Sequence, residues 1–216
     1  MARITVLGGT GYAGKHIVAA AAQRGHDVVA YSRSTPEAPI AGVEYRTGNV
    51  SDPEVIAAAV SGSDVVISAL SPRGELEGQG KLRAFEAEIA RLAQQGGVRF
   101  GVVGGAGSLQ AAPGGPLVID TPDFPDAIKP EARELGSVLE DLRASDEALD
   151  WFFLSPAGGF GAWAPGEATG DYRVGGDVLL VDEEGQSFIS GADLGLAVVR
   201  EIEEPAHRRQ RFTVAY

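Results

Sequence analysis

The stretch RITVLGGTGYAG, residues 3–14, decides the fold of this chain of 216 residues. Residues 3–7 form a short apolar run with three β-branched or hydroxyl-bearing positions, which predicts a strand buried on both faces of a sheet. The run leads directly into Gly8, Gly11 and Gly14, which have the spacing G-x-x-G-x-x-G. The predicted order is strand, glycine turn and helix, which places free backbone N–H groups and the positive end of a helix at one point.

The context of these glycines favours a dinucleotide-binding turn, because the motif follows a strand and opens a helix. The helix is expected from Tyr12 to about Arg24 and ends before Gly25, a residue type common after helix C-termini. A diphosphate fits such a turn because no Cβ atoms block its approach. The alternative is a tight strand–helix turn in an α/β domain that holds no ligand. The residues predicted to contact the dinucleotide here are Gly8, Thr10, Gly11, Tyr12, Ala13 and Gly14.

The end of the second predicted strand, residues 27–33, indicates which dinucleotide is bound. An Asp or Glu at this position would bind the ribose 2′-hydroxyl of NAD, but the chain has S-R-S-T at 32–35. The guanidinium of Arg33 can grip a 2′-phosphate with two parallel hydrogen bonds. The sequence therefore predicts NADP(H) in preference to NAD(H), and the alternative is a solvated Arg33 in a polar loop.

Strands and helices alternate along the rest of the chain, which predicts an α/β fold with a doubly wound parallel sheet of the Rossmann type. Further strands are expected at 43–50, 64–70, 99–103, 150–154 and 211–214, with short ones around 172–174, 178–181 and 187–189. Helices are expected at about 53–60, 81–95, 130–145 and 192–203. We interpret 1–216 as one NAD(P)-binding domain. In it, 1–108 form the dinucleotide-binding core, and 109–216 complete the sheet and add a small C-terminal substrate lobe.

Ligands of doubly wound sheets bind outside the carboxyl ends of the strands, so residues that follow the strands are further candidates. The remaining predicted cofactor contacts are Asn49, Val50, Ala69, Leu70, Ser71, Gly104 and Pro156. Of these, 69–71 are expected to flank the adenosine and the nicotinamide ribose.

The chain lacks the Tyr-x-x-x-Lys pair that supplies a proton for carbonyl reduction in short-chain dehydrogenases. None of its five tyrosines precedes a lysine by four positions, and its lysines are Lys15, Lys81 and Lys129. Ser108, which follows the strand at 99–103, is the best remaining catalytic candidate and could orient the nicotinamide or the acceptor; the alternative is a serine that only serves a turn. Lys129 could approach the cleft from the long loop before it, but a surface lysine is the simpler interpretation. No spacing of His and carboxylates suggests a metal site.

Three aromatic residues lie in glycine- and proline-rich loops that are expected to cover the cofactor cleft. Phe124, Phe160 and Trp163 could stack against a flat acceptor such as an isoalloxazine ring or a quinone. Packing of the small lobe explains them equally well.

Composition limits the partners. A formal net charge of −12 argues against nucleic-acid binding, which relies on Lys and Arg contacts to phosphates. The basic cluster Arg208, Arg209 and Arg211 is interpreted as a solvated edge. With no cysteine, no long apolar run and no signal peptide before the first strand, the sequence predicts a cytoplasmic protein, without a membrane partner, that is a monomer or a homodimer.

Several later motifs carry a family resemblance. They are DTPDFP (120–125), FLSP (153–156), TGDYR (169–173), LLVD (179–182) with IS (189–190), and RQRFTV (209–214). With the glycine turn, they make the chain resemble the NmrA-like atypical short-chain dehydrogenases, more specifically the bacterial NADH-flavin reductase family, and more distantly biliverdin-IX-beta reductase. The chain departs from that pattern at Asn49, near the adenine, where Asp is frequent, and at Asp171, where a basic residue is frequent.

This resemblance implies a dinucleotide fold without the Tyr/Lys pair and hydride transfer from NADPH to a flavin or quinone-like acceptor. A flavin can take its proton from solvent, so no positioned general acid is required. The alternative is a redox sensor that binds NADP(H) and performs no chemistry. A sugar-nucleotide epimerase is disfavoured, because the Tyr/Lys pair is missing and the chain is short.

Overall fold

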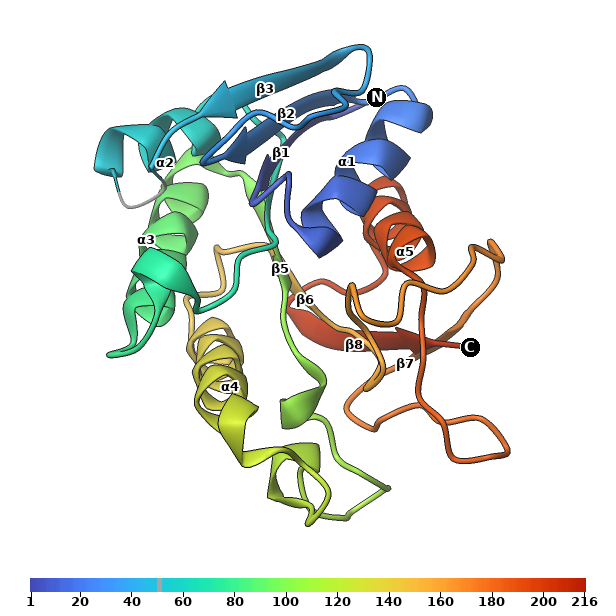
Figure 1. The fold of residues 1–216 in the computed structure, drawn as a ribbon. Coiled ribbons are helices and arrows are strands. Elements are labelled where there is room, and N and C mark those ends of the chain that lie inside the picture. Colours follow the sequence, from blue (N-terminus) through green and yellow to red (C-terminus); the bar gives the residue numbers. More distant parts are fainter. Residues whose placement is uncertain (50–51) are drawn as a thin grey trace.

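The protein is described from a computed structural model, which covers residues 1–49 and 52–216. Its strands are β1 (Arg3–Leu7), β2 (Asp27–Ser32), β3 (Val43–Thr47), β4 (Val65–Ser68), β5 (Arg99–Val103), β6 (Trp151–Ser155), β7 (Arg173–Gly175) and β8 (Gln210–Ala215). They form one sheet of eight strands in the order β3-β2-β1-β4-β5-β6-β8-β7 (Figure 1). Every neighbouring pair is parallel except β7 and β8.

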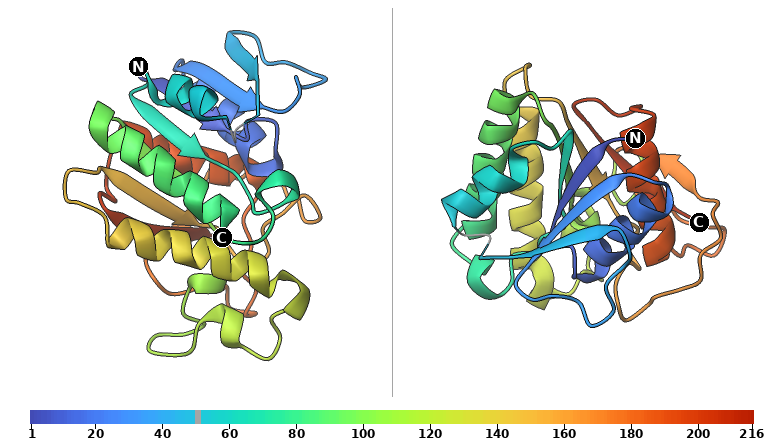
Figure 2. Two further views of the ribbon diagram at one scale, coloured as in Figure 1. Left: turned by 90° about the vertical axis from the view of Figure 1, so that its left-hand side faces the viewer. Right: turned by 90° about the horizontal axis from the view of Figure 1, so that it is seen from above.

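Helices cover both faces of this sheet, as the sequence predicts. They are α1 (Tyr12–Gln23), α2 (Pro53–Val60), α3 (Lys81–Gly96), α4 (Lys129–Arg143) and α5 (Gly191–Glu203). Helices α1 and α5 pack on one face, and α2, α3 and α4 lie on the other (Figures 1 and 2). The strand order reverses at β1, which has β2 on one side and β4 on the other. Ligands of such sheets bind at this switch point, outside the carboxyl ends of the strands.

Each face of the sheet has its own apolar core. Ile17 and Val18 of α1 meet Leu194 and Val198 of α5 in one core. Phe85, Ile89 and Leu82 of α3 join Val138, Leu139 and Leu142 of α4 in the other. The α1–α5 contact is especially close, because a Cβ on Gly195 would lie 2.5 Å from the carbonyl oxygen of His16. The helical spacing of apolar residues in the sequence therefore identifies the faces that pack on the sheet.

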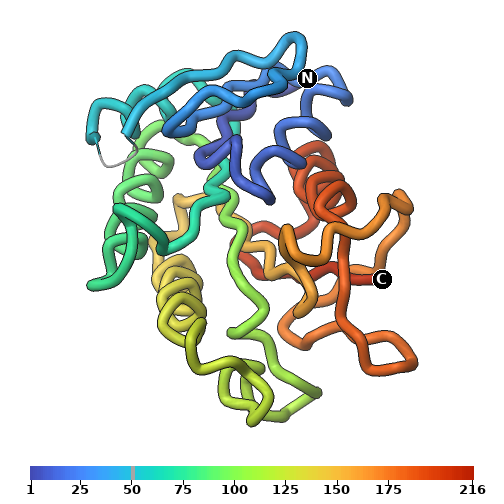
Figure 3. The backbone as a smooth tube through the Cα atoms, in the orientation of Figure 1, coloured from blue at the N-terminus to red at the C-terminus, as the bar shows by residue number. Residues whose placement is uncertain are grey.

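Two predicted strands are wrong. Residues 178–181 and 187–189 have no regular strand structure. Val178 forms only an isolated bridge with Gln110, and the carbonyl of Ser187 accepts from the N–H of Gly159 at 2.7 Å. Ile189 and Leu180 pack into the core on the α1–α5 face of the sheet, so strand-like composition here reflects burial and not a ladder. Figure 3 shows these segments in orange below α5, and the long connection after β5 in yellow-green below α4.

The predicted solvated edge at 208–211 is also wrong for two of its three arginines. The side chain of Arg211 is 3% exposed and pairs with Asp177. Arg209 donates to the carbonyls of Asp146 and Leu149 at 2.7 and 2.9 Å. Only Arg208, 61% exposed and paired with Asp150, fits the expectation. Arg211, which is buried, and Arg209, which is half-buried, join segments far apart in the sequence, so local composition could not reveal their roles.

Candidate functional site

The glycine turn between β1 and α1 is anchored to the neighbouring strand β2. The N–H groups of Gly8 and Gly9 both donate to the carbonyl of Tyr31, at 2.9 and 3.0 Å. Gly8 has a φ of +79°, which L side chains rarely adopt, and its carbonyl accepts from the N–H of Gly11 at 2.9 Å. The turn is therefore a fixed loop that leads directly into the first helical residue.

Close packing explains why glycines occupy this turn. A Cβ on Gly14 would lie 2.1 Å from the carbonyl oxygen of Gly8, and one on Gly9 would lie 2.8 Å from the Cβ of Ala30. A Cβ on Gly8 would lie 2.8 Å from the carbonyl oxygen of Ala69, the residue after β4. The glycine turn and the start of α1 therefore pack closely against the carboxyl ends of β1 and β4.

The start of α1 is open to an anion. Its N-cap is Gly11, no side chain caps it, and its first turn contains no acidic residue. The N–H groups of a first helical turn have no carbonyl partners within the helix, and the helix dipole makes this end positive. Beside it lies a cavity of about 350 Å³. Seven of the predicted cofactor residues line it: Gly8, Thr10, Gly11, Arg33, Ala69, Leu70 and Ser71.

Arg33 lines this cavity. It follows β2, it is exposed, and it makes no ion pair with any residue in the described part of the chain. A Cβ on Gly74 would lie 3.3 Å from its Nη1, so the guanidinium passes over that glycine. The hydroxyl of Ser32, also in the lining, donates to the carbonyl of Ser34 at 2.6 Å. A free guanidinium at this point suits a phosphate.

Arg73, Glu75 and Leu76 line the same cavity but were not predicted from the sequence. They belong to the connection after β4, and Arg73 is held by Glu131 of α4 through contacts of 3.1 and 3.3 Å. Their position directly after residues 69–71 is a signal that could have found them, since residues after a strand end share the ligand edge.

Ser108 lies elsewhere. It lines a second hollow of about 590 Å³, between α4 and the segment after β5, which shares no lining residue with the first. Its Oγ accepts from Nη1 of Arg211 at 3.0 Å, and its carbonyl accepts from the same nitrogen at 2.8 Å. Burial opposes ionisation of Asp177, but the hydrogen bonds and charges of Arg211 and Arg143 lower its pKa. The hollow thus holds a paired, charged network around the serine.

The comparisons with known proteins agree with this geometry. A family described as NAD(P)H-binding matches residues 8–205. The chain belongs to the NAD(P)H-binding family. The uncharacterised protein YwnB of Bacillus subtilis is 37% identical over 215 residues, which is 98% of this chain and 97% of that protein. The family match, together with a similar solved structure described below, confirms the resemblance to the NmrA-like atypical short-chain dehydrogenases that the sequence motifs suggest.

Two solved structures are similar over the full length of this NAD(P)H-binding protein. A candidate exported protein from Burkholderia pseudomallei is 41% identical with a TM-score of 0.86, and each chain is covered completely. A candidate NADH-flavin reductase from Streptococcus pneumoniae is 32% identical with a TM-score of 0.82, covering 100% of this chain and 99% of that one. The predicted Rossmann-type fold is confirmed.

Several predicted cofactor residues do not line the first cavity: Tyr12, Ala13, Gly14, Asn49, Gly104 and Pro156. Asn49 is exposed after β3, and Val50 lies outside the described residues. Gly104 is partly exposed, but Phe153 fills the side on which a side chain would lie, since a Cβ there would be 2.0 Å from Cζ of Phe153. Their roles stay predictions that a bound dinucleotide would test.

The loop after β6 lies over the start of α1. The phenol of Tyr12 donates to the carbonyl of Pro165 at 3.4 Å, and its ring lies 5.3 Å from that of Phe160. Trp163, in the same loop, is 74% exposed. Phe124 lies apart from them, near Gly107, whose Cβ would be 3.6 Å from Cζ of Phe124. The three predicted substrate aromatics therefore occupy two different loops.

The histidines and acids do not form a metal centre: among the described residues, no group of three or more His, Asp or Glu could hold a metal ion. Burial, and secondarily the charge of Lys15, lower the pKa of His16, which is therefore neutral near pH 7. Its ring packs on Tyr12 and against Gly191, a structural role.

No helix in the described ranges has the length and apolar character needed to cross a bilayer.

Proposed function

We propose that this protein is an NADPH-dependent oxidoreductase that reduces a flavin or a quinone-like acceptor. The observation that carries the proposal is the cavity at the uncapped start of α1, whose lining includes Arg33, a guanidinium without an ion pair among the described residues. Membership of the NAD(P)H-binding family supports the cofactor, and the Streptococcus relative named as a candidate NADH-flavin reductase supports the acceptor class.

The residues of the first cavity fit a dinucleotide. N–H groups of the glycine turn and of the first turn of α1 would hold the diphosphate. Arg33, with Arg73 in the same lining, would hold the 2′-phosphate of NADP. Ala69, Leu70 and Ser71 would form the wall beside the adenosine and ribose. This arrangement predicts that removal of the Arg33 guanidinium affects NADPH far more than NADH.

The remaining site residues orient the reacting partners. When bound, NADPH supplies a hydride and the acceptor takes its proton from solvent, so that the products are NADP⁺ and the two-electron-reduced acceptor. Gly104 and Pro156 follow β5 and β6, where the nicotinamide end is expected. Arg211 fixes the hydroxyl of Ser108, which we propose contacts the acceptor or the ring. Phe124, Phe160 and Trp163 would stack on the acceptor.

One alternative uses the same cavity. Because the sequence lacks a Tyr/Lys pair, the protein could instead be a redox sensor that holds NADP(H) and signals through a partner. A cytoplasmic location and a monomeric or dimeric state accompany either function as predictions. Size-exclusion chromatography with light scattering tests the oligomeric state.

The deciding experiment follows NADPH absorbance with purified protein and FMN, FAD or a simple benzoquinone in turn. The oxidoreductase predicts saturable NADPH consumption well above the protein-free rate with at least one acceptor, and slower consumption with Arg33→Ala at subsaturating NADPH. Tight NADPH binding without turnover across the panel would overturn the enzyme and support the sensor. Gly176→Ala, an exchange with no atom within 4 Å of the new Cβ, is the matched control.

A further inference from the structure

The second hollow, between α4 and the segment after β5, has the size of a small-molecule site. Its volume of about 590 Å³ lies within the roughly 300–1,000 Å³ that such sites have. Part of its lining is apolar: Leu117 is 40% exposed, Ile119 is buried, and Ala132 and Gly136 of α4 add small surfaces. The hollow therefore offers apolar contact to a ring or a chain.

The hydroxyl of Ser108 brings a hydrogen-bond donor to this hollow. The side chain of Arg211 is 3% exposed, and its Nη1 donates to the Oγ of Ser108 at 3.0 Å. A guanidinium can only donate, so the serine oxygen is the acceptor in this contact and keeps its own proton for another partner. No residue in the described part of the chain accepts that proton, and Ser108 is partly exposed. The proton is therefore available to a molecule in the hollow.

The amide of Gln110 is a second donor of this kind. Its Oε1 accepts from the N–H of Gly114 at 3.2 Å, which assigns the other side of the amide to the NH₂ group. Within residues 1–49 and 52–216, nothing accepts from this NH₂ group. Gln110 is partly exposed and lines the hollow. Two neutral donors therefore border the same space, and contacts within the protein anchor both of them.

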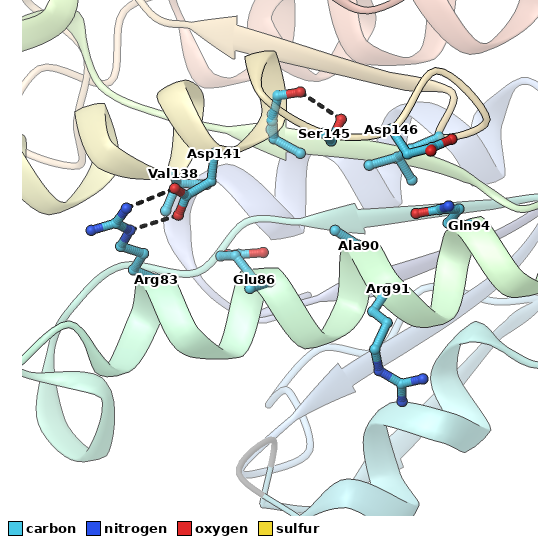
Figure 4. Close-up of a pocket in the computed structure, with 12 residues that line it drawn as sticks. Arg83, Glu86, Ala90, Arg91, Gln94, Val138, Asp141, Ser145 and Asp146 are labelled. Atoms are coloured by element: carbon cyan, nitrogen blue, oxygen red, sulfur yellow. Dashed lines mark hydrogen bonds and ion pairs between the residues drawn. The ribbon is translucent and has the colours of Figure 1, made fainter.

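Three of the four arginines in the lining are held by acids. Arg83 makes two hydrogen bonds to Asp141, at 2.6 and 2.7 Å, as the dashed lines in Figure 4 show. Arg143 and Arg211 both pair with Asp177, which is itself part of the lining. These ion pairs leave Asp177 without free charge for a further cation.

The fourth arginine of the lining, Arg133 of α4, has no such partner. It is exposed, and its guanidinium makes no ion pair or hydrogen bond with any residue that the structure describes. Glu140, the other acid of the lining, is paired with Arg143 at 2.8 Å. The pKa of Asp126 is lowered mainly by Lys129, at 2.6 Å, and least by the charge of Arg133. The hollow thus keeps a positive charge, although the whole chain carries −12.

The three donors border one space. A Cβ on Gly136 of α4 would lie 3.7 Å from the Cβ of Ser108. Arg133 precedes Gly136 by three positions, so the two residues lie on the same face of the helix. Gln110 follows Ser108 by two positions, and all of these residues line the hollow. Donors without acceptors beside an excess positive charge recognise a ligand oxygen with negative charge.

We propose that the second hollow binds the oxyanion of a flat molecule, a carboxylate or a phosphate attached to an apolar ring. The hydroxyl of Ser108 and the NH₂ group of Gln110 donate to the oxyanion, and Arg133 compensates its charge. The ring lies on Leu117 and Ile119. This inference rests on the proposed function only in taking the bound molecule to be the electron acceptor, since the oxyanion site uses no residue of the dinucleotide cavity.

Equilibrium binding without NADPH tests the site separately from the oxidoreductase activity. Isothermal titration calorimetry of the full chain compares 2-naphthoate with its neutral isostere 2-naphthamide, and FMN with riboflavin, which lacks the phosphate. The first pair tests a carboxylate and the second a phosphate. Arg133→Gln removes the free charge, and Ser108→Ala removes the hydroxyl. Arg91→Gln, an exposed position on α3 that lines neither this hollow nor the dinucleotide cavity, is the matched control. Circular dichroism confirms that each variant is folded.

In at least one pair, the anion should bind about tenfold or more tightly than its neutral counterpart, because hydrogen bonds to charged groups are the stronger ones. That pair identifies the oxyanion. Arg133→Gln should weaken binding of the anion about threefold to tenfold, and Ser108→Ala about fivefold, whereas Arg91→Gln should leave it unchanged.

Equal affinities within both pairs, or no binding of either anion in the millimolar range, would overturn the proposal. So would anion binding that survives both hollow variants, or that Arg91→Gln weakens as much as Arg133→Gln does. Anion binding that depends on Arg133 and Ser108, in a protein that reduces no acceptor with NADPH, would refute the proposed function and support the oxyanion site.

Discussion

Alanine substitutions within one glycine motif should separate folding from ligand binding. At Gly14, a Cβ would lie 2.1 Å from the carbonyl oxygen of Gly8, where real contacts essentially never fall below 3.0 Å. At Gly11, the nearest atom to a new Cβ is the same oxygen at 3.2 Å, and the rest of its surroundings is open. Gly11 lines the dinucleotide cavity, whereas Gly14 does not. Gly14→Ala therefore strains the turn, and Gly11→Ala narrows the space available to the ligand.

The expected magnitudes follow from these contacts. Relief of the Gly14→Ala clash needs a shift of roughly 1 Å in a packed turn, which costs about 1–3 kcal/mol. Weakening of the bond from the Gly11 N–H to the Gly8 carbonyl adds about 1 kcal/mol, and the higher helix propensity of alanine offsets about the same amount. Gly14→Ala should thus lower the free energy of unfolding by about 1–3 kcal/mol. Gly11→Ala should lower it by less than about 1 kcal/mol.

Urea unfolding followed by circular dichroism measures the change in stability of each variant, and NADPH titration measures the change in its affinity for NADPH. Gly11→Ala should bind NADPH at least about tenfold more weakly, because its methyl group occupies the approach to the N–H groups, a loss of about 1.4 kcal/mol. Gly176→Ala should match the wild type in both assays. The reasoning is refuted if Gly14→Ala is as stable as the wild type, or if Gly11→Ala binds NADPH with unchanged affinity.

Three further predictions concern charged groups. Arg33→Ala should weaken NADPH binding by about 1.5–3 kcal/mol and leave NADH binding nearly unchanged, and equal losses in calorimetric titrations would contradict this. Burial raises the pKa of Glu86 from 4.5 to about 8, so the folded state holds a proton that the unfolded chain has released. Between these pKa values, wild-type stability should fall with rising pH by about 1.4 kcal/mol per unit relative to Glu86→Gln, and parallel urea-unfolding stabilities would disprove it. Arg99 and Glu201 form a buried ion pair at 2.6 Å, so Arg99→Ala should cost about 3–5 kcal/mol in urea unfolding, whereas the exposed Arg91→Ala should cost less than about 1 kcal/mol.

The features that local sequence determines were predicted well. The strand at Arg3–Leu7 and the helix starting at Tyr12 have the predicted bounds, because apolar pattern, glycine spacing and helix-stop signal all act within a few residues. Gly25, with a φ of +81°, follows the end of α1 as its residue type suggests. Residues after the strand ends, such as Ala69 and Arg33, line the predicted cavity because parallel strands place their carboxyl ends at one edge.

The features that depend on distant contacts could not be predicted. Arg211 is buried only because Asp177 and Ser108 meet it in space, and Ser108 precedes it by 103 residues. The same contact places Ser108 in a second hollow, separate from the predicted dinucleotide cavity, and its contact with a ligand stays a prediction. Likewise, Glu86 has an ordinary place in an amphipathic helix, and only the packing of α4 and Ser68 around it makes it a buried acid.

The central claim is that the start of α1 binds the diphosphate of NADPH. A crystal structure of the protein with NADPH tests it most directly. The account predicts diphosphate oxygens within hydrogen-bond distance of the N–H groups of Gly11, Tyr12 or Ala13, with the 2′-phosphate beside Arg33. A dinucleotide bound elsewhere, or a turn that stays empty at saturating NADPH, would contradict it.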